Sequence, residues 1–281
     1  MKKYISLALA MALGLSLAAC GGSADSAPSA EPSQAAESAA AETAPAESDL
    51  AYVQDKGTLV VGITEFEPMD YQDADGSWIG FDADMAKAFA ESLGVDVEFQ
   101  IIDWDNKVLE LDGKTIDVVW NGMTLTDEVK SAMECSNAYC NNAQVVIVPA
   151  DKAADYETVD SVKGLTFAVE AGSAGKAEVE ALGASYTEVA DQATALLEVS
   201  SGTADAAAID SLMAAAMVGE GTSYADLTYT VGLNSEEYGV GFRKGSDLAE
   251  KLNEFFHASY ADGSMLKIAE TYGVQAAIIE Q

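Results

Sequence analysis

The feature that most constrains the fold is a regular alternation of short apolar runs with amphipathic stretches between residues 58 and 272. Residues 58–63 form an apolar run typical of a buried strand, and residues 82–93 repeat apolar side chains at helical spacing before Gly94. Strands that alternate with helices predict an α/β fold with mostly parallel sheets. Ligands of such sheets bind beyond the carboxyl ends of the strands, so we expect the functional residues to follow them.

The same pattern of apolar residues predicts the other strands and helices of the chain. The predicted strands are 58–63, 95–101, 116–120, 144–148, 165–169, 186–189, 206–209, 227–231 and 238–242. The predicted helices are 82–93, with Asp82 as its N-cap, 104–111, one that starts after Ser173, 192–200, 211–218, 247–260 and 265–272.

The first residues predict export. Lys2 and Lys3 precede an apolar stretch, 5–19, that is too short to span a bilayer, which takes about 20 residues. A basic head followed by a short apolar body is typical of a secretory signal peptide. The ending Leu-Ala-Ala before Cys20 resembles the lipobox of bacterial lipoproteins. We therefore expect a signal peptide over 1–19, lipidation of Cys20 and a membrane anchor that does not span the bilayer.

Composition sets two further limits. Residues 20–50 consist largely of Ala, Ser, Glu and Pro, which predicts a disordered tether. The formal net charge is -33, from 47 acidic and 14 basic residues. This excess of acid argues against nucleic acid as a partner, since that binding needs cations, and against adhesion to anionic lipid.

Two cysteines remain beside Cys20. Cys135 and Cys140 either form a local disulfide or stay as inert thiols. Because His257 is the only histidine, we expect no metal site, and we predict no cofactor.

Two polar segments follow predicted strands. Phe66 and Tyr71 lie in an aromatic and acidic stretch after 58–63, where they either line a cleft or pack into the core. Residues 121–124 follow 116–120, and Asn121 and Thr124 offer hydrogen bonds there. Gly122 and Met123 belong to the same segment, and Gly122 lets a ligand approach the backbone. Thr126 caps the next helix in an alternative reading.

Two more segments have the same placement in the second half. Gly172 and Ser173 lie between a strand and a helix, where free amides attract an anion such as a carboxylate. Asp210 ends the strand 206–209, and it either binds an ammonium group or caps the helix 211–218.

Taken in order, these segments resemble the amino-acid-binding members of the bacterial family 3 extracellular solute-binding proteins. The resemblance covers nearly all of 56–281 and rests on the segments GTLVVGI, EPMDY, GSWIGFDADMAKAFAESLG, DWDNKVLELDGKTIDVVWNGMTLTDE, CSNAYC, VKGLTFAVEAGSAG, GTADAAAID and YGVGFRKGS.

The resemblance implies a type 2 periplasmic-binding-protein fold with two α/β lobes and a ligand in the cleft between them. The expected lobes are 51–144 plus 240–281 and 145–239, joined by crossing strands 145–148 and 238–242. Hinge closure would bury the ligand. The implied function is the substrate-binding subunit of an ABC uptake transporter. We expect a monomer that is lipid-anchored outside the cytoplasm, at a Gram-positive surface or in a periplasm, with a permease as its partner.

The family's ligand contacts can be carried over position by position. Phe66 and Trp104 match the aromatic walls. Asn121, Gly122 and Thr124 match the segment that bonds the ligand's amino and carboxylate groups. Gly172 and Ser173 match the amide turn for the carboxylate, and Asp210 matches the acid that holds the α-ammonium. Tyr71 and Met123, which belong to the same segments, complete the predicted set.

One position departs from the family. An Arg that forks onto the carboxylate is usual five positions after Thr124, and this chain has Val129 there. The neighbouring Lys130 points about 100° away on a helix, and Arg243, the only arginine, is expected outside the cleft. The ligand is therefore an amino acid held by amides and hydroxyls, a molecule without a carboxylate, or a cation.

Two other functions remain open. The fold resembles that of some dehydratases acting on aromatic amino-acid precursors, but His257 lies in a predicted helix without a nucleophile placed beside it. A ligand-sensing receptor module is the third possibility. We predict a binding protein that is not an enzyme and has no catalytic residues.

Overall fold

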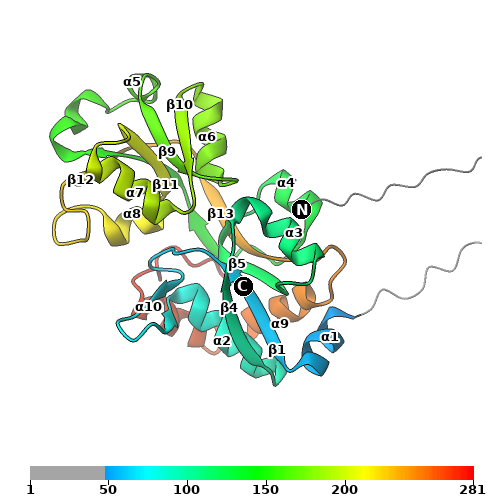
Figure 1. Ribbon diagram of the computed structural model, residues 1–281. Helices are drawn as coiled ribbons and strands as arrows, with labels where there is room; N and C mark the ends of the chain where they lie inside the picture. Colours follow the sequence, from blue (N-terminus) through cyan, green and yellow to red (C-terminus); the bar gives the residue numbers. More distant parts are fainter. Residues whose placement is uncertain (1–47) are drawn as a thin grey trace, which may run out of the picture. The chain divides into compact units, whose positions relative to one another are not determined.

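The apolar run at 58–63 forms the strand β1, which lies between β4 and β5 in the first of two main sheets of the computed structural model (Figure 1). The structure describes residues 48–281. The strand order of this sheet is β4-β1-β5-β13-β6, and β7 pairs with β13. β1 is parallel to β4 and β5, whereas β13 is antiparallel to β5. The strands are β1 (Thr58–Ile63), β4 (Asp96–Ile101), β5 (Val118–Thr124), β6 (Glu134–Cys135), β7 (Cys140–Asn142) and β13 (Glu236–Phe242).

The second sheet uses the chain between β7 and β13. Its order is β10-β9-β11-β8-β12, with β9 parallel to β10 and β11 and with β8 antiparallel to β11 and β12. Its strands are β8 (Gln144–Pro149), β9 (Thr166–Glu170), β10 (Ser185–Val189), β11 (Ala206–Asp210) and β12 (Leu227–Gly232). A small hairpin pairs β2 (Tyr71–Gln72) with β3 (Trp78–Ile79).

Helices connect the strands of both sheets. The α-helices are α1 (Asp49–Lys56), α2 (Phe81–Leu93), α3 (Lys107–Asp112), α4 (Asp127–Ala132), α5 (Val159–Val162), α6 (Ala174–Leu182), α7 (Gln192–Ser201), α8 (Ser211–Met217), α9 (Leu248–Ala261) and α10 (Ser264–Thr271). Two 3-10 helices are η1 (Trp104–Asn106) and η2 (Ala150–Asp155). The predicted α/β alternation is confirmed.

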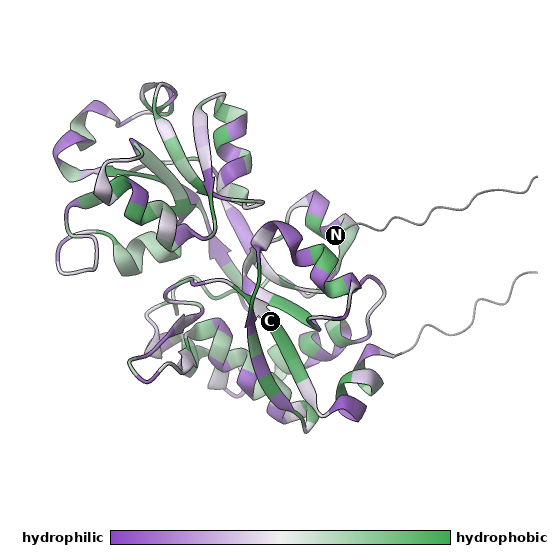
Figure 2. Ribbon diagram, in the orientation of Figure 1, coloured by the Kyte–Doolittle hydropathy of each residue, from purple (hydrophilic) through white to green (hydrophobic). Residues whose placement is uncertain are grey.

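Each sheet forms a hydrophobic core where its apolar strands pack. In the first sheet, Trp120 and Tyr139 each pack against Phe256 of α9 with ring centroids 5.6 Å apart. In the second, β8 and β11 are buried along almost their whole length. Figure 2 shows β1 largely in green, whereas the edge strand β4 and the helices carry purple residues among green ones, as elements with one exposed side do.

The chain passes between the two sheets at the junctions of strands. It leaves the first sheet at Ala143, between β7 and β8, and returns through residues 233–235, between β12 and β13. The crossings thus lie beside the expected segments 145–148 and 238–242. Residues 236–239, assigned from sequence to the second lobe, pair with β5 and β7 of the first sheet.

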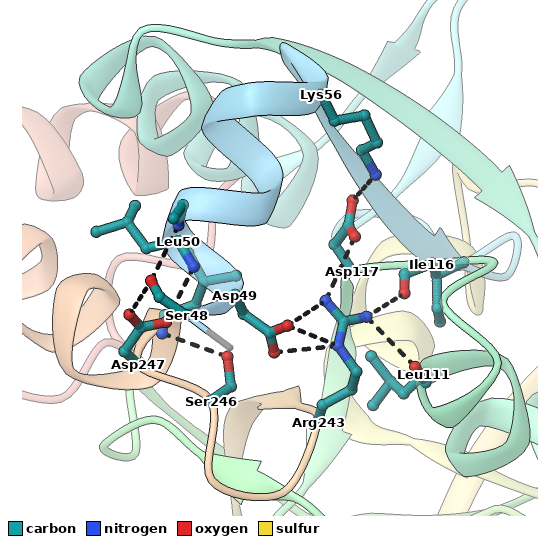
Figure 3. A network of polar contacts seen from close by, with 12 residues as sticks. Ser48, Asp49, Leu50, Lys56, Leu111, Ile116, Asp117, Arg243, Ser246 and Asp247 are labelled. Carbon is teal, nitrogen blue, oxygen red and sulfur yellow. Dashed lines mark hydrogen bonds and ion pairs between the residues drawn. The ribbon is translucent and has the colours of Figure 1, made fainter. Parts of the chain in front are cut away.

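The folded part begins earlier than the sequence predicted. Ser48 caps α1, and its hydroxyl also donates to Asp247 at 2.5 Å. Residues 48–50 therefore belong to the fold and not to the predicted tether, whereas the predicted signal peptide, Cys20 and the remaining tether lie outside the described residues. Figure 3 shows that Arg243 holds this helix, because its guanidinium bonds to Asp49 at 3.0 Å and lies 3.5 Å from Asp117.

The two cysteines of the folded part are free thiols, in contrast to the disulfide that the sequence favoured as one alternative. Cys135 pairs with Gly241 and Cys140 with Tyr238, both on β13. Three positions along a strand span about 10 Å. That is beyond the Cα separation of about 7 Å that a disulfide tolerates.

Within residues 48–281, every helix is too short or too polar to cross a lipid bilayer. The same residues contain no group of three or more His, Cys, Asp or Glu side chains arranged to hold a metal ion.

Candidate functional site

A cavity of about 310 Å³ lies where the strands of both sheets end. Its walls come from the loop after β1, from η1 and α3, from the end of β5 and α4, and from the ends of β9 and β11 with α6. The predicted site residues that line it are Phe66, Trp104, Asn121, Gly122, Met123, Thr124, Gly172, Ser173 and Asp210. The lining also contains Asp105, Lys107, Glu128, Val129, Glu170, Lys176 and Glu180.

Tyr71 lies elsewhere. It belongs to β2, and its ring meets that of Tyr272 edge to face at 6.4 Å. Its inclusion followed from its proximity in sequence to Phe66. The hairpin of β2 and β3 takes it away from the cavity lining.

The residues predicted to follow a strand are the last residues of β5 itself, because the strand runs from Val118 to Thr124 and not from 116 to 120. Gly122 has φ +56°, and a Cβ on it would lie 2.5 Å from Cε1 of Phe66. Only glycine lets the Phe66 ring approach the strand so closely. The pair sets the position of one aromatic wall.

Two buried carboxyl groups lie behind this wall. The Asn121 amide donates to Asp70 at 2.8 Å, and the Gly122 amide donates to Asp82 at 2.7 Å. Asp82 is not the N-cap that the sequence suggested: Gly80 holds that position, and the Asp82 side chain also accepts from Tyr139 at 2.7 Å. Burial raises the pKa of Asp82 to about 7. Both acids hold β5 in place beneath the cavity.

Asp210 is the most heavily bonded acid of the site. Although it takes the N-cap position of α8, its side chain makes no capping bond. The carboxylate instead accepts from Tyr238 at 2.6 Å, from Gln144 at 3.0 Å and from the amides of Asn142 and Gln192. Burial, followed by the neighbouring Glu236, raises the pKa of Asp210 to about 7.

Glu236 joins both crossings to the cavity. Its carboxylate accepts from Thr124 at 3.0 Å, from Asn142 at 2.7 Å and from Gln144 at 2.8 Å. Because Asn142 and Gln144 flank the first crossing and Glu236 begins the strand after the second, the hinge segments share hydrogen bonds with a residue of the predicted site. These partners could not be predicted from sequence, because they lie far apart along the chain.

Glu170 is a functional candidate that sequence reasoning missed. It ends β9, is 3% exposed and lines the cavity, and its Oε1 has no hydrogen-bond partner. Burial, followed by the nearby Asp210, raises the pKa of Glu170 to about 8. Its position at the carboxyl end of a strand, just before the turn at Gly172, was the available signal.

The turn after β9 approaches the opposite wall closely. Gly172 has φ +69°, and a Cβ on it would lie 2.6 Å from Oδ1 of Asp105. Ser173 caps α6 through a bond from the Lys176 amide at 3.1 Å. Across the cavity, Lys107 Nζ donates to the carbonyls of Gly172 and Trp104, each at 3.1 Å. Lys107 therefore bridges the two walls, and the sequence did not predict this contact.

That lysine also occupies one aromatic face. Lys107 Nζ lies 4.9 Å from the centre of the Trp104 ring. Burial lowers the pKa of Lys107, against the opposing effect of Glu170. Trp104 itself is 8% exposed.

The position of the missing arginine is part of the cavity wall. Val129 lines it from α4, and Thr126 caps that helix by accepting from the Val129 amide at 3.1 Å, as one sequence reading expected. Arg243 lies outside the lining, bonded to Asp49 and to the carbonyl of Ile116. His257 is exposed and lies 3.2 Å from the Gln281 carbonyl, also outside the lining.

Known proteins share this arrangement. The family model of the bacterial extracellular solute-binding proteins, family 3, matches residues 59–275. The arginine-binding extracellular protein ArtP of Bacillus subtilis is 27% identical over 281 residues, covering 97% of this chain and 98% of that protein.

Two solved structures are similar over most of the chain. A substrate-binding protein of an ABC uptake transporter from Streptococcus pneumoniae with bound histidine has a TM-score of 0.73 and 32% identity, covering 82% of this chain and 98% of its own. The ancestral amino-acid-binding protein AncCDT-1, a precursor of cyclohexadienyl dehydratase, has a TM-score of 0.73 and 30% identity, covering 80% of this chain and 99% of its own. The family match and the shared fold confirm the predicted fold class, and the chain belongs to the bacterial extracellular solute-binding proteins, family 3.

Proposed function

We propose that this protein is the extracytoplasmic substrate-binding subunit of an ABC uptake transporter and that it binds an amino acid or a closely related small molecule. The observation that carries this proposal is the cavity at the strand ends of both sheets, lined by aromatic rings and by buried acids. Family membership, a relative named for arginine and a similar structure with bound histidine support it.

In the proposed complex, Phe66 and Trp104 contact the apolar part of the ligand. Asp210 receives its ammonium group, and the amides at Gly172 and Ser173 receive an anionic group. The hydrogen bonds of Glu236 to both crossings support a hinge whose closure follows ligand binding.

The proposal extends to location and partners. The signal peptide over 1–19 and the lipid on Cys20 would hold a monomer at the outer face of the membrane, on a Gram-positive surface, where it meets a permease. The sequence pattern at Lys2, Lys3 and Cys20 supports this placement. Release of the protein from membranes by a Cys20→Ser substitution tests it.

A thermal-shift screen of the purified full chain against the standard amino acids, polyamines and quaternary ammonium compounds tests the function. A ligand that binds the folded state at a hundredfold excess over its dissociation constant stabilises it by about 2.7 kcal/mol. We expect a clear shift with one group of amino acids. The absence of a shift with every compound would contradict the proposal.

One observation favours a second function, that of a dehydratase. Glu170 is a buried carboxyl group facing the cavity, and burial raises its pKa to about 8, which suits a general acid that protonates a leaving hydroxyl. We place this second because the relatives named above are binding proteins. A spectrophotometric assay for water loss from a cyclohexadienyl acid, with Glu170→Gln as the control, tests it.

A further inference from the structure

One oxygen of the buried Glu170 carboxyl group, Oε1, has no hydrogen-bond partner among the described residues. The carboxyl group is 3% exposed, lines the cavity and leaves Oε1 without a hydrogen bond. A buried polar atom left unpaired costs about 1 to 3 kcal/mol, and more when it is charged. Asp210, by contrast, has four side-chain donors around it. A polar ligand group in the cavity would supply the bond that Oε1 lacks.

The charges around the cavity determine the sign of that group. Five acids line it, Asp105, Glu128, Glu170, Glu180 and Asp210, against two lysines, Lys107 and Lys176. Lys107 Nζ already donates to two carbonyl oxygens, and Lys176 Nζ pairs with Glu188 at 2.9 Å. Burial raises the pKa of Glu170 to about 8, so this group is largely protonated in the empty cavity, and the four other acids still outnumber the two lysines.

The position at which the family usually has an Arg that binds the ligand's carboxylate is uncharged here, because Val129 occupies it. The Thr124 hydroxyl is not free to donate to a carboxylate either, since it already donates to Glu236. The amides at the start of α6 and the Lys107 ammonium remain for an anionic group, but Lys107 already has the acids Glu170, Asp105 and Glu128 near it.

We propose that Glu170 is a specificity-determining residue that, together with Asp210, selects a ligand carrying an amine or guanidinium cation. This inference rests on the proposed function and names the charge of its substrate. A guanidinium or ammonium group between the two carboxyl groups gives Oε1 its missing bond, and charge-assisted bonds of this kind are about twice as strong as neutral ones. The Phe66 ring adds a face for the cation. Cationic amino acids and amines without a carboxylate share this chemistry.

Matched ligand pairs test the inference by isothermal titration calorimetry of the full chain. Arginine with citrulline, and lysine with norleucine, differ in the positive charge and little in size, and agmatine is arginine without its carboxylate. We expect at least one amino acid with a cationic side chain to bind about 10- to 100-fold more tightly than the counterpart whose side chain is uncharged, the range expected for one hydrogen bond to a charged group. Tighter binding of agmatine than of arginine assigns the ligand to the amines, and the reverse assigns it to the amino acids.

Three variants assign the selection to Glu170. Glu170→Gln keeps the size but removes the charge, and we expect it to abolish the preference for the cation. Glu170→Asp keeps the charge, so it should keep the preference at lower affinity. Glu157→Gln makes the same change at an exposed position outside the lining and should leave binding unchanged.

Two results would overturn the inference. One is equal or tighter binding of citrulline, norleucine or an acidic amino acid by the wild-type protein, which needs no variant to be informative. The other is an unchanged preference in a folded Glu170→Gln variant. In both cases the proposed function stands, because an amino acid still binds, whereas failure to bind any compound of the screen refutes the proposed function itself.

Discussion

The ligand-free protein should become more stable at pH 8, relative to pH 5, when Glu170 is replaced by glutamine. Burial raises the pKa of Glu170 from 4.5 to about 8, so the folded protein retains a proton that the unfolded chain has released. Stability contributed by this proton is fully present below pH 4.5 and is lost as the pH rises through 8. Glutamine does not titrate, so the variant lacks this loss.

The magnitude follows from the two pKa values. Each pKa unit corresponds to about 1.4 kcal/mol, so the rise from 4.5 to about 8 sets a ceiling of about 5 kcal/mol. Asp210 and Asp191 raise the pKa of Glu170 and Lys107 lowers it, and water entering the cavity screens all three interactions. One proton changes the free energy of unfolding by at most about 1.4 kcal/mol per pH unit, so we expect that of Glu170→Gln, relative to wild type, to rise by about 1 to 4 kcal/mol between pH 5 and pH 8.

Urea denaturation at pH 5, 6, 7 and 8 measures this difference, after bound ligand has been removed by unfolding and refolding. Glu157→Gln is the matched control, because that side chain is exposed. Its replacement should change the free energy of unfolding by the same amount at every pH. A wild-type-to-variant difference that stays constant from pH 5 to pH 8, or that changes in the opposite direction, would refute the reasoning.

Three further predictions concern the scaffold. Arg243→Met should lower the free energy of unfolding by about 3 to 5 kcal/mol in urea denaturation, because it leaves buried carboxylates without their cation; a loss below about 1 kcal/mol would contradict this. Gly122→Ala should weaken ligand binding in calorimetry and lower the free energy of unfolding by about 1 to 3 kcal/mol. The control Gly76→Ala, also at positive φ but with open space around it, should leave binding intact. Equal binding by both variants would contradict the tight contact between Gly122 and Phe66. Cys135 and Cys140 should both react with a thiol reagent in the unfolded, non-reduced protein, and their failure to react would mean that they are bonded.

Much of the fold could be predicted from sequence because the strands are short apolar runs between polar helices. β1 and β8 match their predictions to within a residue. β5 does not, because its last residues, Asn121 to Thr124, look like a polar loop. They remain in the strand because Asp70 and Asp82 satisfy their polar groups from behind.

The cavity was predicted less completely than the strands. Residues at strand ends, such as Asn121 and Asp210, could be predicted from position alone. Lys107 and Glu236 could not, because each reaches the cavity through contacts with residues more than 60 positions away. Glu170 ends a strand as Asp210 does and could have been predicted by the same rule. The Gly-Ser turn beside it was the stronger signal, so the prediction named Gly172 and Ser173 and not Glu170.

A crystal structure of the protein with the tightest ligand of the screen would show directly which residues bind it. We expect the ligand in the cavity between the ends of β5 and β9, in contact with Phe66, and with its cationic group within hydrogen-bond distance of Glu170 or Asp210. A ligand bound elsewhere, or one that turns an anionic group toward Glu170, would contradict this expectation.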